Sequence, residues 1–431
     1  MSIVRDEFYI KRSIEPVLLA AAREFPAVTL TGPRQSGKTT LLRRHFSSSH
    51  RYVSFESPEV RAAAETDPRG FLAQHPAPVI FDEIQHAPGL LPCIKEAIDE
   101  RRPEHGRYLL TRSAIGAATA ESLAGRTAML RLLPLSRREA RGQPDAPLPW
   151  ERAEAAAPVG GTGGLAPHLH DLWSDIVRGG YPELTAQPDR SLARWHEAYL
   201  QTWLERDVRG LRAVGDLNLF QAFLRALAAR SGQLLNVADL ARGLGTAPNT
   251  VRAWISVLEA TCQVRVVRPW PEHLGRRMVK TPKVYFTDTG LLCRLVGLRD
   301  PHHAAGGPLG AALFETAVLA ELVRTLTHRG QEPSIWFWRT SNGREVDFLV
   351  EWDGRLVPIE VRLSATPRPA MGDAIRRLRT DLGERCLPGY VVHLGAQRLP
   401  LGEGVTALPL SELCRPGPQN GRGDEAGGRL A

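Results

Sequence analysis

The chain has 431 residues, of which 43% are hydrophobic and 24% are charged. At roughly 150 residues per domain, this length predicts two to four domains, and the composition excludes wholesale disorder and a fibrous repeat. The net charge of +8 favours an acidic partner such as nucleic acid. Only five of the 55 basic residues are lysine, a bias typical of a GC-rich genome, so the abundance of arginine is weak evidence for DNA binding. A lysine in so lysine-poor a chain is expected where an ammonium group is required.

The sequence indicates neither a membrane span nor a zinc site. No stretch approaches the ~20 consecutive apolar residues that a membrane helix needs, and charged residues interrupt the N-terminal segment. The five cysteines are scattered and form no C-x-x-C pair, which predicts no disulfide framework. We therefore expect a cytoplasmic protein with no membrane partner.

A glycine-rich loop between an apolar run and a helix-like segment is the strongest motif. Residues 27–31 predict a buried strand, and residues 32–39 form a full G-x-x-x-x-G-K-T sequence, for which a chance glycine-rich turn is the alternative. In such a loop the backbone N–H groups wrap the phosphates of a nucleotide, Lys38 reaches the β- and γ-phosphates, and the Thr39 hydroxyl binds Mg²⁺. The loop predicts that ATP and Mg²⁺ are bound by Gly32, Pro33, Arg34, Gln35, Ser36, Gly37, Lys38, Thr39 and Thr40.

A second motif lies about forty residues further on. Residues 79–83 read as an apolar strand that ends in two carboxylates, Asp82 and Glu83. In this arrangement the first acid holds Mg²⁺ and the second polarises the attacking water. We expect Asp82 to bind the metal and Glu83 to act as the catalytic base of ATP hydrolysis, assisted by Lys38.

These motifs and three further segments resemble a known family. The further segments are Ser122-Leu123-Ala124-Gly125-Arg126, Leu133-Pro134-Leu135-Ser136 and Gly179-Gly180-Tyr181-Pro182-Glu183. The resemblance is to bacterial and archaeal AAA-type P-loop ATPases with a C-terminal domain of unknown function, DUF4143. It implies an AAA-type ATPase domain over residues 1–140. Sites of AAA-type ATPases often lie between subunits, which is compatible with a homo-oligomer.

The same resemblance implies further catalytic residues. The segment 109–113 is similar to the family strand whose polar tip senses the γ-phosphate, so Thr111 and Ser113 are candidate sensors, although Arg112 stands where the family usually has glycine. Arg126 is similar to a family arginine that stabilises charge on the transferred phosphoryl group, in cis or across a subunit boundary. The alternative is a surface arginine that pairs with Glu121.

The middle of the chain changes character twice. Residues 141–170 are rich in Pro, Gly and Ala without apolar periodicity and predict a flexible insertion. Residues 171–300 predict a helical domain that ends in a winged helix, because two helices around a glycine-containing turn are followed by two strand-like runs. Such a module either places its second helix in a DNA groove or packs within the protein. The outward face of that helix carries only Arg252, Ser256 and Glu259.

Residues 301–415 show the order helix, three strands, helix, strand, which resembles the restriction-endonuclease-like fold. In that resemblance an Asp on the second strand, an E-x-K on the third and a helical Glu form the catalytic site. The matching residues here are Glu315, Asp347, Glu360 and Arg362, so an arginine replaces the required lysine. A guanidinium stays protonated and fills the space differently, which makes cleavage doubtful. A phosphate-binding pseudo-nuclease, a nuclease that tolerates arginine and a structural set of ion pairs remain open.

The expected protein is of the α/β class, with a P-loop AAA-type domain, a helical winged-helix middle, a restriction-endonuclease-like domain and a disordered tail over 416–431. Its expected function is Mg²⁺-dependent ATP hydrolysis coupled to a cleavage-impaired half that contacts DNA. One alternative is a nucleotide-gated regulatory switch with negligible turnover, and another is an ATP-regulated DNA endonuclease.

Overall fold

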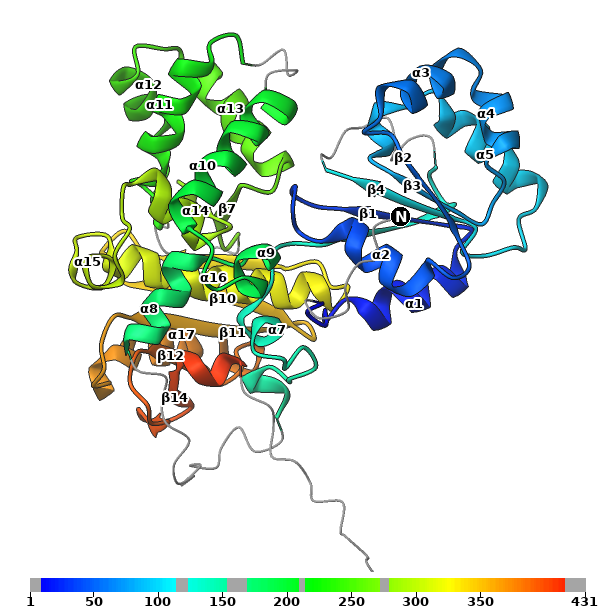
Figure 1. The fold of residues 1–431 in the computed structure, drawn as a ribbon. Coiled ribbons are helices and arrows are strands. Elements are labelled where there is room, and N and C mark those ends of the chain that lie inside the picture. The colour runs from blue at the N-terminus through cyan, green and yellow to red at the C-terminus, as the bar shows by residue number, and fades with distance from the viewer. Residues whose placement is uncertain (1–8, 114–122, 153–168, 209–213, 272–278, 415–431) are drawn as a thin grey trace, which may run out of the picture.

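The computed structural model describes the whole chain except residues 1–8, 114–122, 153–168, 209–213, 272–278 and 415–431. Figure 1 shows an N-terminal lobe, drawn in blue to cyan, beside a larger lobe that holds most of the remaining chain. No helix in the described part of the chain combines the length and apolar character of a membrane span. The predicted disordered tail lies outside the described residues.

The N-terminal lobe is built on a parallel sheet with the strand order β2-β3-β4-β1-β5 among the described residues. Successive side chains of a strand point to opposite faces. Ala27 of β1 accordingly packs with α3, α4 and α5, while Val28 and Leu30 pack with α1 and α2 on the other face. The elements are α1 (Glu15–Glu24), β1 (Ala27–Thr31), α2 (Lys38–Phe46), β2 (Arg51–Ser54), α3 (Pro58–Thr66), α4 (Pro68–Gln74), β3 (Val79–Asp82), α5 (Leu90–Glu100), β4 (Tyr108–Arg112) and β5 (Thr127–Arg131).

Helices dominate the upper part of the larger lobe (Figure 1). Trp195, Tyr199 and Trp203 of α10 are at most 5% exposed and form part of its core, as their three- and four-residue spacing indicates. A π-helix (Leu204–Val208) directly continues α10. The described helices from residue 137 to residue 306, not all of which lie in the upper part, are α7 (Arg137–Ala140), α8 (Leu169–Arg178), α9 (Pro182–Ala186), α10 (Leu192–Trp203), α11 (Leu217–Ala228), α12 (Val237–Gly243), α13 (Pro248–Ala260), α14 (Thr289–Leu295) and α15 (Pro301–Gly306).

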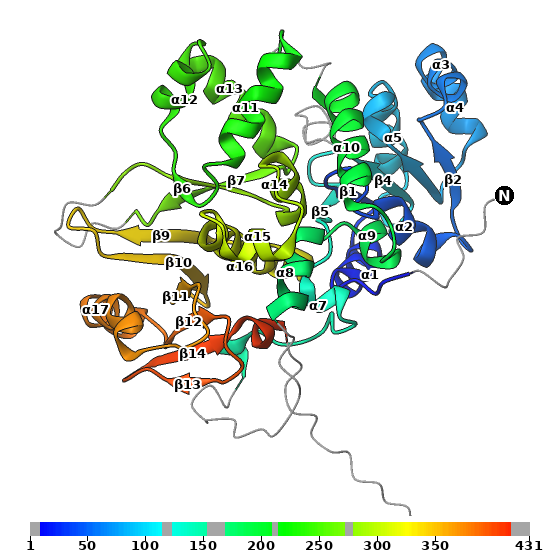
Figure 2. The same cartoon turned by 60° about the vertical axis from the view of Figure 1, so that its left-hand side comes forward.

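A second sheet runs through the larger lobe in the order β13-β14-β12-β11-β10-β9-β7-β8-β6 among the described residues (Figure 2). The parallel pairing of β7 with β9 makes it continuous, so the expected boundary between residues 300 and 301 separates strands of one sheet. The strands and C-terminal helices are β6 (Gln233–Leu234), β7 (Val264–Pro269), β8 (Lys283–Phe286), α16 (Gly310–His328), β9 (Ile335–Arg339), β10 (Glu345–Trp352), β11 (Arg355–Arg362), α17 (Asp373–Leu382), β12 (Gly389–His393), β13 (Leu399–Pro400) and β14 (Val405–Pro409).

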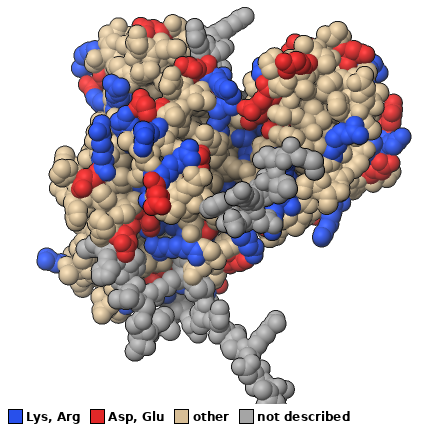
Figure 3. All heavy atoms as spheres, in the orientation of Figure 1, with Lys and Arg blue, Asp and Glu red and all other residues tan. Residues whose placement is uncertain are grey.

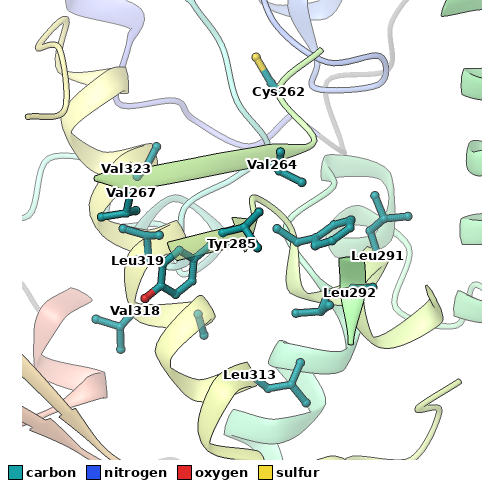
Figure 4. Close-up of a cluster of buried hydrophobic side chains, with 14 of the residues drawn as sticks. Cys262, Val264, Val267, Tyr285, Leu291, Leu292, Leu313, Val318, Leu319 and Val323 are labelled. Carbon is teal, nitrogen blue, oxygen red and sulfur yellow. The ribbon is translucent and has the colours of Figure 1, made fainter. Parts of the chain in front are cut away.

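The helix α16 lies against this sheet and is buried along most of its length. Figure 4 shows side chains of β7, β8, α14 and α16 meeting in one apolar cluster, which includes Val267, Tyr285, Leu291 and Leu319. Because strands from both sides of residue 300 pack on the same helix, the middle and C-terminal parts of the chain share a core.

Part of the predicted flexible insertion is packed. Within residues 141–152, Leu148 is fully buried and Trp150 contacts the rings of Trp352 and Tyr390. The absence of periodicity did not predict this, because an irregular segment buries single apolar side chains without a repeating pattern. The insertion residues 153–168 lie outside the described part of the chain.

Candidate functional site

The glycine-rich loop follows β1 at the edge of the sheet where the carboxyl ends of β1, β3 and β4 lie. Gly32 has φ +148°, and a Cβ atom at this position would lie 2.0 Å from the carbonyl oxygen of Leu132, so only glycine fits. Gly37 has φ +93° and immediately precedes α2. Arg12 donates from Nη1 to the carbonyl oxygen of Ser36 over 2.9 Å and supports the loop from the N-terminal segment.

Lys38 is buried within the loop. Its ammonium donates to the carbonyl oxygens of Gly32 at 3.0 Å and Pro33 at 2.9 Å, and it lies 3.4 Å from Ser113 Oγ. Burial lowers the pKa of Lys38, while the charge of Glu83 acts in the opposite direction. The ammonium is therefore held by neutral oxygens, which it can exchange for phosphate oxygens.

Asp82 at the end of β3 lies beside the first residues of α2, as the two motifs predict. Thr39 donates from Oγ1 to Asp82 Oδ1 over 2.7 Å, Thr111 donates to the same oxygen over 2.5 Å, and Tyr52 donates to Oδ2 over 2.8 Å. A hydroxyl and a carboxylate are the hard oxygen ligands that Mg²⁺ prefers. The donor set of Thr39 and Asp82 therefore fits the ion.

Glu83 has φ +58°, which is uncommon for a residue other than glycine and re-aims its side chain after the strand. Ser113 donates to both carboxylate oxygens at 2.6 and 2.8 Å, and Gln85 donates to Oε2. Burial opposes ionisation, but Lys38 and these hydrogen bonds outweigh it and hold the pKa of Glu83 below its usual value. Glu83 is thus an ionised carboxylate beside Lys38, suited to accept a proton from water.

Of the catalytic residues that the resemblance implies, Ser113 lies at the glycine-rich loop and Arg126 does not. Ser113 reaches Glu83 even though Arg112 stands in the glycine position, where its side chain is buried. Arg126 precedes β5 at the opposite edge of the sheet and pairs with Asp99 at 2.7 Å. The structure therefore does not bring Arg126 to the loop of its own chain, and its expected partner Glu121 lies outside the described residues.

A second contact at the loop was not predicted from the sequence. Arg34 Nε lies 2.9 Å from Asp207 Oδ2, and both side chains are nearly buried. Asp207 belongs to the π-helix that continues α10, so this ion pair ties the loop to the larger lobe. Tyr52, Arg12 and Asp207 lie outside the two motifs, and no local pattern marks them.

A buried network also joins the lobes behind the loop. Arg12 donates to Oε1 of Glu139 over 3.2 Å, and Nδ1 of His328 in α16 lies 3.0 Å from the same oxygen. The N–H of Leu133 donates to His328 Nε2, so the proton of a neutral imidazole lies on Nδ1, toward Glu139. Burial lowers the pKa of His328, and although burial opposes ionisation of Glu139, Arg12 and His328 hold the pKa of Glu139 far below its usual range.

The predicted nuclease-like residues lie close together at the C-terminal sheet. Glu315 projects from α16, Asp347 from β10, and Glu360 and Arg362 from β11. Asp347 accepts the N–H of Val361 over 2.8 Å, and Arg362 forms an ion pair with Glu360. Within the described residues, no three His, Cys, Asp or Glu side chains are placed to hold one metal ion.

Sequence reasoning missed the cation at the centre of this cluster. Lys283 of β8 lies 3.0 Å from Glu315, 2.5 Å from Glu345 and 3.7 Å from Asp347, and its side chain is 5% exposed. Burial would lower the pKa of Lys283, but the three carboxylates outweigh it and hold that pKa above its usual value. The scarcity of lysine in the chain was the signal that could have found it.

Burial and neighbouring charges shift the pKa values of the carboxylates in this cluster. Burial, followed by the charge of Asp347, raises the pKa of Glu315 to about 7, although Lys283 and the hydroxyl of Tyr285 oppose the shift. Burial also raises the pKa of Glu360, which is 1% exposed. A cavity of about 590 Å³ opens beside Asp347 and Glu360 and is also lined by Arg344, Arg362 and Arg377.

Three known domain families match the chain in succession. A family described as an AAA domain matches residues 24–141, a domain of unknown function (DUF8612) matches 169–302, and a domain of unknown function (DUF4143) matches 310–413. Two relatives, the uncharacterized proteins Mb2031c of Mycobacterium bovis and Rv2008c of Mycobacterium tuberculosis, are each 31% identical over 412 residues, which is 94% of this chain and 85% of theirs. The chain belongs to this family of AAA-domain proteins with a DUF4143 domain.

Solved structures include similar chains. A Walker-type ATPase of Pyrococcus abyssi has 13% identity and a TM-score of 0.45, over 68% of this chain and 98% of that one. The Aeropyrum pernix Orc1 protein, solved in complex with DNA, has 16% identity and a TM-score of 0.30, over 66% of this chain and 91% of that one.

The family assignment places the two sites in different segments of this AAA–DUF4143 protein. The glycine-rich loop, Asp82 and Glu83 all lie in the AAA domain. Glu315, Asp347 and Glu360 lie in DUF4143, whereas Lys283 lies in the preceding DUF8612 segment. The carboxylate cluster is therefore completed by a residue from outside the domain that carries the acids.

Proposed function

We propose that the protein is an Mg²⁺-dependent ATPase whose C-terminal half contacts DNA. The observation that carries the first part is the hydrogen bond of 2.7 Å between Thr39 and Asp82. Lys38 directly precedes Thr39, and the ionised Glu83 directly follows Asp82. The two sequence motifs thus form one site with a metal-binding pair, a phosphate-binding ammonium and a base.

In this proposal the residues act in sequence on bound ATP. Lys38 exchanges the carbonyl oxygens of Gly32 and Pro33 for the β- and γ-phosphates, and Thr39 and Asp82 hold the ion. Mg²⁺, when bound, neutralises charge on the phosphates. Glu83, fixed by Ser113, takes a proton from a water molecule whose oxygen bonds to the γ-phosphorus as the bond to the bridging oxygen breaks and ADP leaves.

ATP turnover by the full-length protein tests this proposal. We expect steady hydrolysis that rises when duplex or single-stranded DNA is added, and a loss of about 10²–10⁴-fold in Glu83→Gln with nucleotide binding retained, because the amide cannot accept the proton. Glu56→Gln, which changes an exposed carboxylate of the same lobe, is the matched control. Equal turnover in wild type and Glu83→Gln would contradict the assignment.

The DNA contact rests on local features rather than on overall charge. Figure 3 shows basic and acidic side chains interspersed over the face of the molecule that it presents. The exposed arginines Arg344, Arg362 and Arg377 instead surround the cavity beside Asp347, where they can contact backbone phosphates. We also propose that α12, α13 and the β7–β8 hairpin form a winged helix, with Val251, Trp254, Ile255 and Leu258 of α13 buried against the core.

We assign phosphate binding without cleavage to the DUF4143 domain, in a restriction-endonuclease-like arrangement. Arg362 is paired with Glu360 and cannot act as the adjustable proton donor that a lysine provides. Binding of fluorescent duplex DNA should weaken steeply with salt, and Arg344→Gln with Arg377→Gln should reduce both the affinity and the salt slope. Unchanged salt dependence in that double variant would place the DNA contact elsewhere.

One observation favours a second function, that of a nucleotide-gated switch with negligible turnover. The Arg12–Glu139–His328 network connects the carbonyl of Ser36 in the loop to α16, which carries Glu315. A change at the loop on ATP binding can therefore reach the C-terminal cluster through buried contacts. ATP-dependent DNA affinity without measurable hydrolysis would favour this switch over the ATPase.

A further inference from the structure

The carboxylates of the C-terminal cluster are already paired with side-chain cations. Glu315 faces Lys283 and the hydroxyl of Tyr285, Asp347 faces Lys283 and the N–H of Val361, and Glu360 faces Arg362. The resemblance to nucleases implies that three of these acids converge on Mg²⁺. In the described part of the chain they do not converge in that manner.

Lys283 is positioned as a permanent member of this cluster. It is 4% exposed, its ammonium lies 5.7 Å from the centroid of the Phe337 ring, and the same ammonium contacts carboxylates from α16 and from β10. The cavity beside Asp347 is lined by Glu345, Asp347 and Glu360, whereas the nearly buried Lys283 is not among its lining residues. The carboxylates therefore face the cavity, while the ammonium contacts them from within the protein.

A divalent cation and an ammonium compete for the same negative charge. An ammonium within 4 Å of three carboxylates repels a second cation strongly in a buried site, where screening is weak. With Lys283, Arg339 and Arg362 paired to these acids, three cations face the four carboxylates Glu315, Glu345, Asp347 and Glu360, so little negative charge remains to attract a metal ion.

We propose that the ammonium of Lys283 is the resident cation of this cluster and stands in for the divalent metal ion that the nuclease resemblance implies. The cluster then holds its shape without metal, and the arginines around the cavity meet phosphate without a metal-activated water. Lys283 is a positioning residue for Glu315 and Asp347. The inference requires neither ATP turnover nor DNA binding, so failure of the proposed function leaves it intact.

Uptake of Mn²⁺ by the nucleotide-free, full-length protein tests the inference. Mn²⁺ alone is the probe, and electron paramagnetic resonance measures the free ion. Mn²⁺ uptake should be the same in wild type and in Asp347→Asn, because the cluster of wild type binds no Mn²⁺. Lys283→Met keeps the aliphatic stem and deletes the charge, so it should gain one Mn²⁺ site per chain, at least about tenfold tighter than any uptake detected at this cluster in wild type. Adding Asp347→Asn to Lys283→Met should abolish that gain, and Asp82→Asn identifies any ion at the nucleotide site.

Two outcomes would overturn the inference. One is a wild-type protein that binds one Mn²⁺ per chain, lost in Asp347→Asn and retained in Asp82→Asn. The other is a folded Lys283→Met variant with no additional Mn²⁺. If Lys283→Met does not fold, the inference is tested by comparing Mn²⁺ uptake in wild type and in Asp347→Asn. The unfolding temperature of wild type is a second test, and it should be equal in Mn²⁺ and in a chelator.

Discussion

Two lysines of this protein lie beside buried carboxylates, and their surroundings are opposite. Lys38 is bonded to the carbonyl oxygens of Gly32 and Pro33, and burial lowers its pKa. Lys283 is bonded to Glu315 and Glu345, and carboxylates hold its pKa above its usual value. The first ammonium is available to an incoming phosphate, whereas the second is committed to the fold.

The acids differ in the same way. Glu83 has a pKa below its usual value and is ionised next to Lys38, which suits a base. Glu315 has a pKa raised to about 7 by burial and by Asp347, even with Lys283 in contact. Lysine and glutamate thus occur in two kinds of site. At the glycine-rich loop the lysine is bonded to neutral oxygens, and at the C-terminal cluster the lysine is paired with carboxylates.

Removal of Lys283 should have the largest effect on stability. Lys283→Ala leaves Glu315 and the buried Asp347 without this cation, whereas Glu345 keeps Arg339 as a partner, and breaking a buried pair typically costs about 3–5 kcal/mol. Chemical denaturation of the full-length protein measures the loss in free energy of unfolding. Lys280→Ala, an exposed lysine three residues earlier, is the matched control and should be nearly neutral.

Removal of Lys38 should act on ligand binding instead of stability. Lys38→Ala should weaken ATP binding by at least about 100-fold, because charge-assisted bonds to phosphate are lost and each contributes about 1.5–3 kcal/mol. Calorimetric titration with ATP measures the affinity, with the exposed Lys95→Ala as control. Equal ATP affinity in wild type and Lys38→Ala would contradict the assignment of the nucleotide site. A large loss in the free energy of unfolding of Lys38→Ala would contradict the expected difference between Lys38 and Lys283.

The pH dependence of stability separates the two acid clusters further. Glu315 has a pKa of about 7 in the folded protein and 4.5 as the reference value, so between these pH values the folded chain holds a proton that the unfolded chain has released. Stability from this group therefore falls as pH rises from about 4.5 to about 7, by an amount on the order of 1–2 kcal/mol. Glu315→Gln should remove that slope in denaturation curves measured across this range, whereas an unchanged slope would assign it to another group.

The smallest change is expected from Arg362→Lys. Its side chain is 46% exposed, and the new ammonium can retain contact with Glu360, so stability should change by less than about 1 kcal/mol. Because Lys283 still lies beside Glu315 and Asp347, we expect this variant, like wild type, to leave supercoiled plasmid intact in Mg²⁺ or Mn²⁺. If Arg362→Lys nicks the plasmid and the added Asp347→Ala abolishes the nicking, position 362 alone limits cleavage. If wild type nicks the plasmid and Asp347→Ala does not, the protein is a working nuclease.

Local sequence determined much of the fold and the whole nucleotide loop. The run over 32–39 is contiguous and follows a strand that apolar composition predicts, and within it Gly32 meets the backbone of Leu132 while Gly37 has a positive φ. The order helix, three strands, helix and strand after residue 310 was also predicted from the sequence pattern, and it corresponds to α16, β9, β10, β11, α17 and β12. Asp82 joins Thr39 because parallel strands align their carboxyl ends.

Tertiary structure alone decided the partners of buried charges. Lys283 meets Glu315 and Asp347 because β7 pairs with β9 and brings β8 under α16, an arrangement that no local pattern encodes. Arg126 is remote from the loop for a similar reason, since it precedes β5 while the loop follows β1. The pKa of a buried group depends on desolvation and on the charges of residues that are distant in the sequence. The different surroundings of Lys38 and Lys283 therefore arise only from the tertiary structure.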